Sequence, residues 1–217
     1  MKKILVALVV VASVLTACKN EKKQQLAVND TFNGAEDVAI VVSEKYNVDL
    51  AASVLNWKGT KPLGAHDGVV SLKNGSLVLE EGKLIDGEFV IDMNSIKNVD
   101  MKGTEGAGKI EGHLMSADFF DVAKYPTSKF VVTSVKDTGA GKIDVTGKLT
   151  IKDVTKTVTI PAMISTNAGI TTFKSETFKI NRTDYNVKYG SKSFFDNLKD
   201  KFIDDIMEMS FVVKTKA

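Results

Sequence analysis

An alternation of apolar and polar residues in the second half of the chain constrains its fold most. In residues 142–152, Ile143, Val145, Leu149 and Ile151 are apolar residues at odd positions, whereas every even position is polar. Successive side chains of a strand point to opposite faces, so this period of two predicts a β-strand with one face towards a core and one towards water. Residues 154–164 and 203–214 show similar alternation.

Turn signals separate these runs at short intervals, which predicts antiparallel pairing. They are Asn74-Gly75, Glu81-Gly82, Asp86-Gly87, Thr138-Gly139 and Asn167-Ala168-Gly169. Helical candidates are limited to residues 111–120 and 193–201, each long enough for two or three turns. A doubly wound nucleotide-binding fold needs longer helices between its strands and is therefore disfavoured.

Many short strands with one polar face fold as a sandwich or as a barrel, and closing a barrel removes the exposed edges that promote aggregation. We predict an all-β fold, an extended antiparallel barrel of about eight strands with one or two short helices. An interior of that size can hold one small ligand if side chains do not fill it.

The first eighteen residues resemble an export signal. Lys2 and Lys3 precede an apolar run over residues 4–14, which is too short to span a bilayer comfortably. The following Leu-Thr-Ala-Cys, residues 15–18, resembles the lipobox of bacterial lipoproteins. This resemblance implies that residues 1–17 are a signal peptide and that Cys18 carries diacylglycerol and acyl chains such as palmitate. The alternative is an ordinary secretory signal with Cys18 near the cleavage point.

Residues 18–45 are predicted to be the lipidated cysteine followed by a flexible tether, because residues 19–25 are almost wholly polar. An apolar patch at residues 38–42 could be an extra edge strand or the first barrel strand, and the pattern leaves this open. Residues 46–217 contain no linker-like break and are expected to form one domain.

Charge and cysteine content exclude further classes of protein. Without residues 1–17, the chain has 27 acidic side chains and as many basic ones, and no basic cluster that favours nucleic acid. Every basic residue is lysine except Arg182. The single cysteine rules out an intramolecular disulfide, so stability must come from a core.

Three ordered segments resemble the signature of the YceI-like proteins. They are residues 113–121 (HLMSADFFD) with Tyr125-Pro126 and Phe130, residues 147–156 (GKLTIKDVTK) and residues 180–185 (INRTDY). The resemblance implies a lipocalin-like barrel that binds polyisoprenoid or other long amphiphilic lipids. Three departures are Asp153, where the family has glycine, Tyr185, where it has phenylalanine, and residues 49–53, which lack the histidine of the family pattern.

An apolar tail needs an apolar tunnel, and inward-facing residues of the predicted strands could form it. Methionine suits this role because its thioether adapts to irregular chains. Plain core packing is the alternative at each position, and an end cap without ligand contact is the alternative for the Phe119-Phe120 pair. The candidate ligand-binding residues are Phe119, Phe120, Phe130, Val145, Leu149, Phe173, Phe178, Met207, Met209 and Phe211.

Arg182 is a further candidate ligand-binding residue. Its planar guanidinium lies near Asn181 and Asp184 in sequence and could bind a carboxylate or phosphate through two hydrogen bonds. The alternative is a structural arginine–aspartate pair that fixes two strands.

Enzymatic signals are weak. Residues 103–109 match the first part of a phosphate-binding loop, but Ile110 replaces the required serine or threonine, so a mobile loop at the barrel mouth is the simpler interpretation. His66 and His113 are the only histidines and do not predict a zinc site. Trp57 lines the mouth or packs beneath a loop. We expect no catalytic residue, no metal and no cofactor.

We therefore predict an exported, lipid-anchored barrel that binds an isoprenoid, quinone or fatty-acyl amphiphile for storage, transport or a stress response. One alternative is a surface lipoprotein with a filled barrel that acts through protein contacts, and a third is an enzyme that modifies lipids. The expected location is the cell envelope. Lys19 replaces the aspartate that marks inner-membrane retention in some bacteria, which favours the outer membrane, facing the periplasm, or the cell surface.

Overall fold

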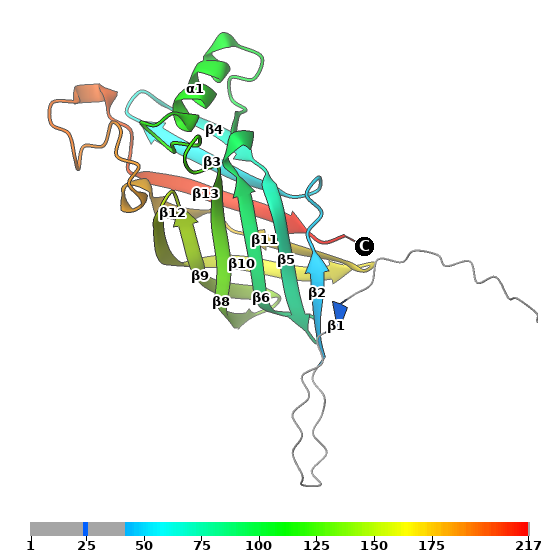
Figure 1. Ribbon diagram of the computed structural model, residues 1–217. Coiled ribbons are helices and arrows are strands. Elements are labelled where there is room, and N and C mark those ends of the chain that lie inside the picture. Colours follow the sequence, from blue (N-terminus) through cyan, green and yellow to red (C-terminus); the bar gives the residue numbers. More distant parts are fainter. Residues whose placement is uncertain (1–23, 26–41, 217) are drawn as a thin grey trace, which may run out of the picture.

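The computed structural model describes residues 24–25 and 42–216 and shows one large antiparallel sheet that curls around a core (Figure 1). The sheet has thirteen strands, with the neighbour order β1-β2-β5-β6-β8-β9-β10-β11-β13-β3-β4-β7 and β12 paired to β13. The strands are β1 (Gln24–Gln25), β2 (Ser43–Asn47), β3 (Val54–Lys61), β4 (Gly64–Val70), β5 (Leu72–Glu80), β6 (Lys83–Asp92), β7 (Lys97–Asn98), β8 (Thr127–Gly139), β9 (Lys142–Ile151), β10 (Val154–Asn167), β11 (Ile170–Ser175), β12 (Phe178–Asn181) and β13 (Ile206–Lys214).

The predicted number of about eight strands is too low, because several strands are consecutive pieces of longer ones. β2 leads into β3 through a bend, and β4 leads into β5 through Ser71. Because β2 pairs with β5 and β3 pairs with β4, these four strands form one long, bent hairpin. β6 and β7 are likewise separated only by η1 (Met93–Ser95) and residue Ile96. Bends of this kind let a sheet curve, and sequence patterning does not reveal them.

Strands β2 and β13, which are far apart in the neighbour order of the sheet, are joined at their ends by backbone hydrogen bonds. Val48 forms an antiparallel bridge with Thr215, the Asp49 N–H donates to the Lys214 carbonyl at 2.8 Å, and the Lys216 N–H donates to the Asn47 carbonyl at 3.0 Å. Figure 1 shows the end of β13 next to β2. The prediction of an all-β, antiparallel, lipocalin-like fold is therefore confirmed.

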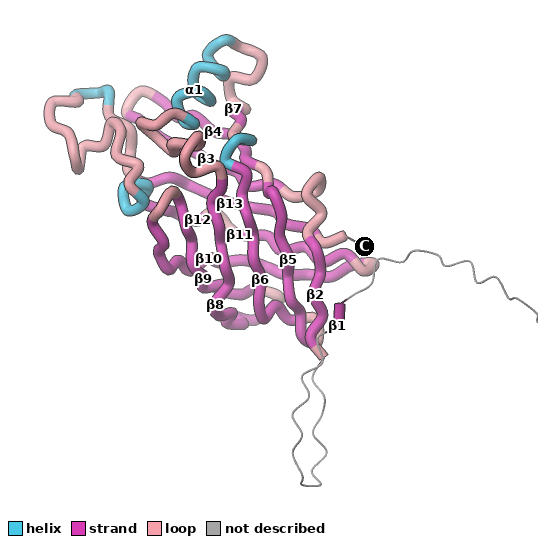
Figure 2. Tube along the Cα trace, viewed as in Figure 1, coloured by secondary structure: helices cyan, strands magenta, loops and turns pink. Residues whose placement is uncertain are grey.

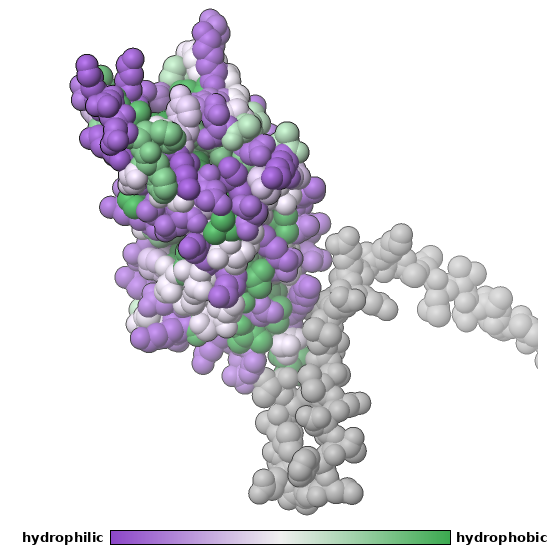
Figure 3. Space-filling model, turned by 60° about the vertical axis from the view of Figure 1, so that its left-hand side comes forward, coloured by the Kyte–Doolittle hydropathy of each residue, from purple (hydrophilic) through white to green (hydrophobic). Residues whose placement is uncertain are grey.

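The outer face of the sheet is polar, as the alternation predicts. Threonine side chains on adjacent strands hydrogen-bond across it, for example Thr146 to Thr159 and Thr150 to Thr155, each at 2.8 Å. Figure 3 shows one side of the molecule as a mosaic in which hydrophilic residues predominate. The apolar face is turned inwards.

The one α-helix of the described residues, α1 (Glu105–Met115), stands over one end of the barrel (Figure 2). It begins after Thr104, whose side-chain oxygen accepts a hydrogen bond from the Ala107 N–H at 3.3 Å. The helix predicted at residues 111–120 is thus misplaced towards the C-terminus, because the start of α1 depends on this cap. The segment expected to be a mobile loop, residues 103–109, instead contains the start of α1, because only Gly103 and the cap Thr104 precede the helix.

The second predicted helix, at residues 193–201, is wrong except for the 3₁₀ turn η3 (Lys199–Lys201). Another 3₁₀ turn, η2 (Arg182–Tyr185), follows β12. Most of the segment from Asn186 to Asp205 is a loop at the same end of the barrel as α1 (Figure 1). Its sequence lacks the apolar stripe that would stabilise a helix against the barrel.

The expected N-terminal features lie largely outside the described residues. This applies to residues 1–17, to Cys18 and to residues 38–41 of the apolar patch. Within the segment expected to be a tether, Gln24 pairs with Lys45 and Gln25 with Glu44. β2 begins at Ser43, before the expected start of the domain at Tyr46.

Candidate functional site

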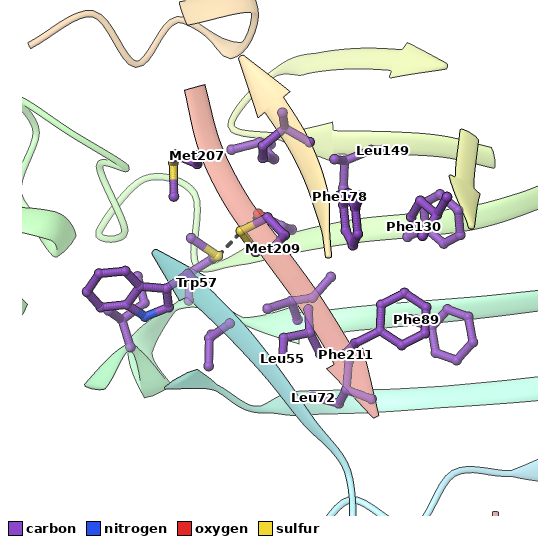
Figure 4. A pocket seen from close by; sticks show the side chains of 18 of the residues that line it. Leu55, Trp57, Leu72, Phe89, Phe130, Leu149, Phe178, Met207, Met209 and Phe211 are labelled. Carbon is purple, nitrogen blue, oxygen red and sulfur yellow. Dashed lines mark hydrogen bonds between the residues drawn. The ribbon is translucent and has the colours of Figure 1, made fainter. Parts of the chain in front are cut away.

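An apolar cavity of about 120 Å³ occupies the interior of the barrel. Most of its lining residues come from strands around the barrel (Figure 4), and others come from η1, from α1 and from the segment that follows α1. Ser128 is the one polar residue among them. The Ser128 hydroxyl donates to Met93 Sδ at 3.2 Å. The wall thus offers carbon and sulfur surface, which suits an apolar chain.

Eight of the predicted ligand-binding residues line this cavity. They are Phe120, Phe130, Leu149, Phe173, Phe178, Met207, Met209 and Phe211. Phe119 lies instead beside a second cavity. Val145 is fully buried and lines neither cavity, because its part of the interior is filled by side chains.

The remaining lining residues were not predicted as ligand-binding residues. They are Leu55, Trp57, Val70, Leu72, Phe89, Ile91, Met93, Ile96, Leu114, Ser128, Ile151, Ile160, Ile180 and Val213. Many belong to β3–β6, where the pairing of β5 with β6 shifts register between Leu72 and Asn74 and between Val78 and Leu79. These irregularities interrupt the period of two and hide the inward-facing set. Alternating apolar residues within β6, such as Phe89 and Ile91, were the available signal.

Aromatic rings are concentrated on one side of the cavity. The ring centroids of Phe89 and Phe173 are 6.0 Å apart, and those of Phe173 and Phe211 are 4.7 Å apart. Figure 4 shows Phe89 and Phe130 towards one end of the lining and Trp57 at the other. The contacts between these rings stabilise this side of the wall.

A second cavity of about 180 Å³ lies beside the first. Trp57, Leu114 and Met207 line both cavities, so these three side chains separate them. The second cavity is also lined by Ile110 and His113 of α1, which places it beneath the helix at the end of the barrel.

Polar groups surround this second cavity. Among its lining residues, His66 places Nδ1 2.9 Å from Asp100 Oδ2, and Lys61 Nζ lies 3.4 Å from His66 Nε2. Burial of Asp100 works against its ionisation, but hydrogen bonds from His66, Asp67 N–H and Asn98 together lower the pKa of its carboxyl. The end of the barrel beneath α1 is thus more polar than the main cavity.

Arg182 holds the backbone of a loop and does not present a free guanidinium. It is 1% exposed and donates to the carbonyls of Asp204 (3.0 Å), Val187 (2.8 Å) and Ile203 (2.9 Å), and Nη2 lies 3.5 Å from Asp205 Oδ1. Burial lowers its pKa, while Asp205 and Asp204 act in the opposite direction. Arg182 borders the second cavity, and these contacts favour the structural alternative, an arginine that fixes the backbone, over direct binding of an anion.

Trp57 has an unusual environment. It is 7% exposed, and within the described residues its indole Nε1 has no hydrogen-bond partner. Its ring contacts the backbone of Gly68, its partner residue on β4. Trp57 therefore forms part of the partition between the cavities and does not simply pack beneath a loop.

The described part of the chain lacks two features. There, no group of three or more histidine, cysteine, aspartate or glutamate side chains is arranged to hold a metal ion. Nor does any helix in residues 42–216 combine the length and apolar character needed to cross a membrane.

Solved structures with a similar fold include two bacterial proteins. BcnA from Burkholderia cenocepacia is 25% identical, with a TM-score of 0.61, and the match covers 78% of this chain and 99% of BcnA. A polyisoprenoid binding domain from Saccharophagus degradans, implicated in plant cell wall breakdown, is 18% identical, with a TM-score of 0.58, and the match covers 79% of this chain and 98% of that domain.

Curated relatives match over shorter stretches. A UPF0312 protein from Shewanella denitrificans is 39% identical over 89 residues, which are 41% of this chain and 44% of the relative. A UPF0312 protein from Pseudomonas putida is 62% identical over 50 residues, which are 23% of this chain and 26% of the relative. The matched stretches thus span less than half the length of these relatives.

The family model for the YceI-like domain matches residues 46–215, which include both cavities and nearly all of the barrel. The chain belongs to the YceI-like family.

Proposed function

We propose that this protein binds the apolar chain of an isoprenoid, quinone or fatty-acyl amphiphile inside its barrel, for storage or transport. The observation that carries the proposal is the main cavity, whose lining residues are apolar except for Ser128. The likeness in fold to a domain described as polyisoprenoid binding adds support.

The two cavities suggest how an amphiphile would lie. The tail would occupy the apolar cavity, and the polar end would lie beneath α1, near Lys61 and His66. The partition formed by Trp57, Leu114 and Met207 would have to open for one molecule to span both. Met207 is suited to such movement because its side chain is unbranched and flexible.

The size of the cavity limits what it holds without rearrangement. An engineered apolar cavity of about 150 Å³ binds benzene, so 120 Å³ accommodates roughly one isoprene unit. A longer tail requires the lining to expand. The small volume also favours a second candidate function, a filled barrel that acts through protein contacts, because ligand sites usually enclose several hundred Å³.

The location in the cell is part of the same proposal. Lipidation of Cys18 would anchor the barrel in the cell envelope, in the outer membrane facing the periplasm or at the cell surface. Two or three acyl chains suffice for stable anchoring, because each buried methylene contributes about 0.8 kcal/mol. In this proposal the barrel acts by binding and not by catalysis.

Native mass spectrometry of protein purified without detergent tests the binding function. We expect a population with additional mass that organic extraction removes and that added polyprenyl alcohol restores. Leu149→Phe, which adds volume inside the cavity, should reduce this population at least fivefold. Leu50→Phe, the same change at a residue 41% exposed, should leave it unchanged. An unliganded mass for the wild type, with no uptake of added lipid, would support the filled barrel instead.

A further inference from the structure

The loop between Asn186 and Asp205 exposes aromatic side chains to solvent. Tyr189, Phe194 and Phe195 are 45%, 48% and 50% exposed, and they are the large aromatic residues of the described chain that are most open to water. A soluble protein of this size could bury phenylalanines in its core, so two adjacent exposed ones indicate an interaction surface.

The loop backbone holds these side chains outwards. The N–H groups of Phe194 and Phe195 both donate to the Ser191 carbonyl, at 3.2 and 3.0 Å, and Ser191 itself is fully buried. The Ile203 N–H donates to the Gly190 carbonyl at 2.8 Å, which closes the base of the loop. The backbone that carries the exposed rings is therefore held by hydrogen bonds.

The charge of the loop complements an anionic surface. The outer part of the loop, residues 188–201, contains lysines at positions 188, 192, 199 and 201 and aspartates at positions 196 and 200, which leaves two more positive than negative charges. Asp204 and Asp205 lie at the base of the loop, where they accept hydrogen bonds from Thr60 and Ser193. Lys188 Nζ lies 4.4 Å from the centre of the Phe194 ring, so a cation accompanies the aromatic tip. Aromatic side chains flanked by lysines are typical of segments that bind the interface of an anionic bilayer.

The position of the loop connects this surface with the cavities. The ring of Tyr189 lies 4.5 Å from that of His113, which lines the cavity beneath α1. The turn between β3 and β4 reaches the same end of the barrel and carries Leu63, which is 82% exposed (Figure 1). Thr60, near the end of β3, donates a hydrogen bond from its hydroxyl to the Asp204 carboxylate at 2.6 Å and so links this turn to the loop.

We propose that residues 188–201 dock this end of the barrel on an anionic lipid bilayer, with Phe194 and Phe195 inserted among the lipid headgroups. The docked loop brings the cavity beneath α1 to the membrane surface. If the proposed lipid-binding function holds, an apolar tail then passes between bilayer and barrel without crossing water.

Co-sedimentation with lipid vesicles tests the docking. The full chain with Cys18→Ser, which cannot be acylated, is mixed with vesicles of equal parts phosphatidylglycerol and phosphatidylcholine, or of phosphatidylcholine alone. We expect binding to the anionic vesicles that weakens at least tenfold in Phe194→Ser/Phe195→Ser and at least threefold in Lys192→Glu/Lys199→Glu. High salt should weaken it further.

Met163→Ser/Ile170→Ser provides a matched control, because these residues are 46% and 38% exposed in strands that meet at the opposite end of the barrel. This variant should bind as the Cys18→Ser parent does. Equal binding by the parent and the phenylalanine variant, or equal binding to neutral and anionic vesicles, would overturn the proposal. Lipid occupancy measured by native mass spectrometry is a separate readout that the phenylalanine substitutions should leave unchanged, so docking and lipid binding can fail independently.

Discussion

Trp57 and Gly68 are paired on adjacent strands, and the indole ring occupies the space where a side chain at Gly68 would lie. A Cβ atom at Gly68 would lie 2.4 Å from Cζ2 of Trp57 and 1.9 Å from the Lys97 carbonyl oxygen. Gly68 therefore leaves free the space that the Trp57 ring occupies between the two cavities.

Gly68→Ala should destabilise the protein, since the clash with a backbone carbonyl cannot be relieved by a side-chain movement alone. We expect the free energy of unfolding in urea to fall by about 2–3 kcal/mol. Gly59→Ala is the control, because nothing lies within 4 Å of a Cβ atom there, and it should change stability by less than about 1 kcal/mol. Equal effects of both substitutions would show that the Trp57–Gly68 contact is not a constraint.

Arg182→Lys should loosen the loop that Arg182 holds. Lysine cannot reproduce the planar set of hydrogen bonds to the carbonyls of Val187, Ile203 and Asp204, so we expect a loss of about 2–4 kcal/mol and faster proteolysis within residues 186–205. The exposed Lys179→Ala should have little effect. Unchanged stability with a loss of lipid binding would instead assign Arg182 to the ligand.

Stability should fall at alkaline pH because of Tyr185. Burial, with a contribution from Asp184, raises the pKa of this phenol from 10.0 to about 12. The folded state favours the neutral phenol, whereas in the unfolded chain the phenol loses its proton near pH 10. The contribution of Tyr185 to stability is therefore complete below pH 10 and is lost as the pH rises towards 12. Urea unfolding between pH 9 and pH 12 should show this loss, up to about 2 kcal/mol. Tyr185→Phe should make the profile flatter, and an unchanged profile would exclude Tyr185 as the cause.

Helix α1 should be weak because it contains glycines on its exposed side. At Gly108 and Gly112, a Cβ atom would have nothing within 4 Å, so alanine fits at both positions. Each substitution to alanine should stabilise the helix by about 0.5–1 kcal/mol. Hydrogen exchange of the α1 amides should slow accordingly, whereas the amides of β8 and β9 should not change. Faster exchange in α1 would contradict this explanation.

The sequence predicted the fold class well because apolar and polar residues alternate along those strands that have no bulge or bend. The pattern in residues 142–152 corresponds to β9, in which Ile143, Val145 and Ile151 are buried and the polar even positions are exposed or half-buried. The strands β5 and β6 were harder to interpret, because bulges shift their register and Gly75 and Gly87 interrupt the apolar alternation.

The candidate site was only partly predictable for a different reason. Val145 and Leu149 lie on the same face of β9, yet only Leu149 borders the cavity. The position of a cavity depends on where the side chains of several strands together leave space unfilled, and one strand's sequence does not show this. The partners of Arg182 are backbone carbonyls, which leave no residue-specific signal in a sequence. The contact of Trp57 with Gly68 likewise depends on pairing between strands.

Fluorescence of Trp57 offers the most direct test that the barrel holds a lipid tail. It is the only tryptophan in the chain and lines both cavities, so a quencher inside the barrel must lie close to it. Titration of delipidated protein with a brominated fatty acid should give saturable quenching with one molecule bound per barrel, and Leu149→Phe should weaken it at least fivefold. Quenching that rises without saturation, or that is equal in Leu149→Phe, would contradict binding inside the barrel.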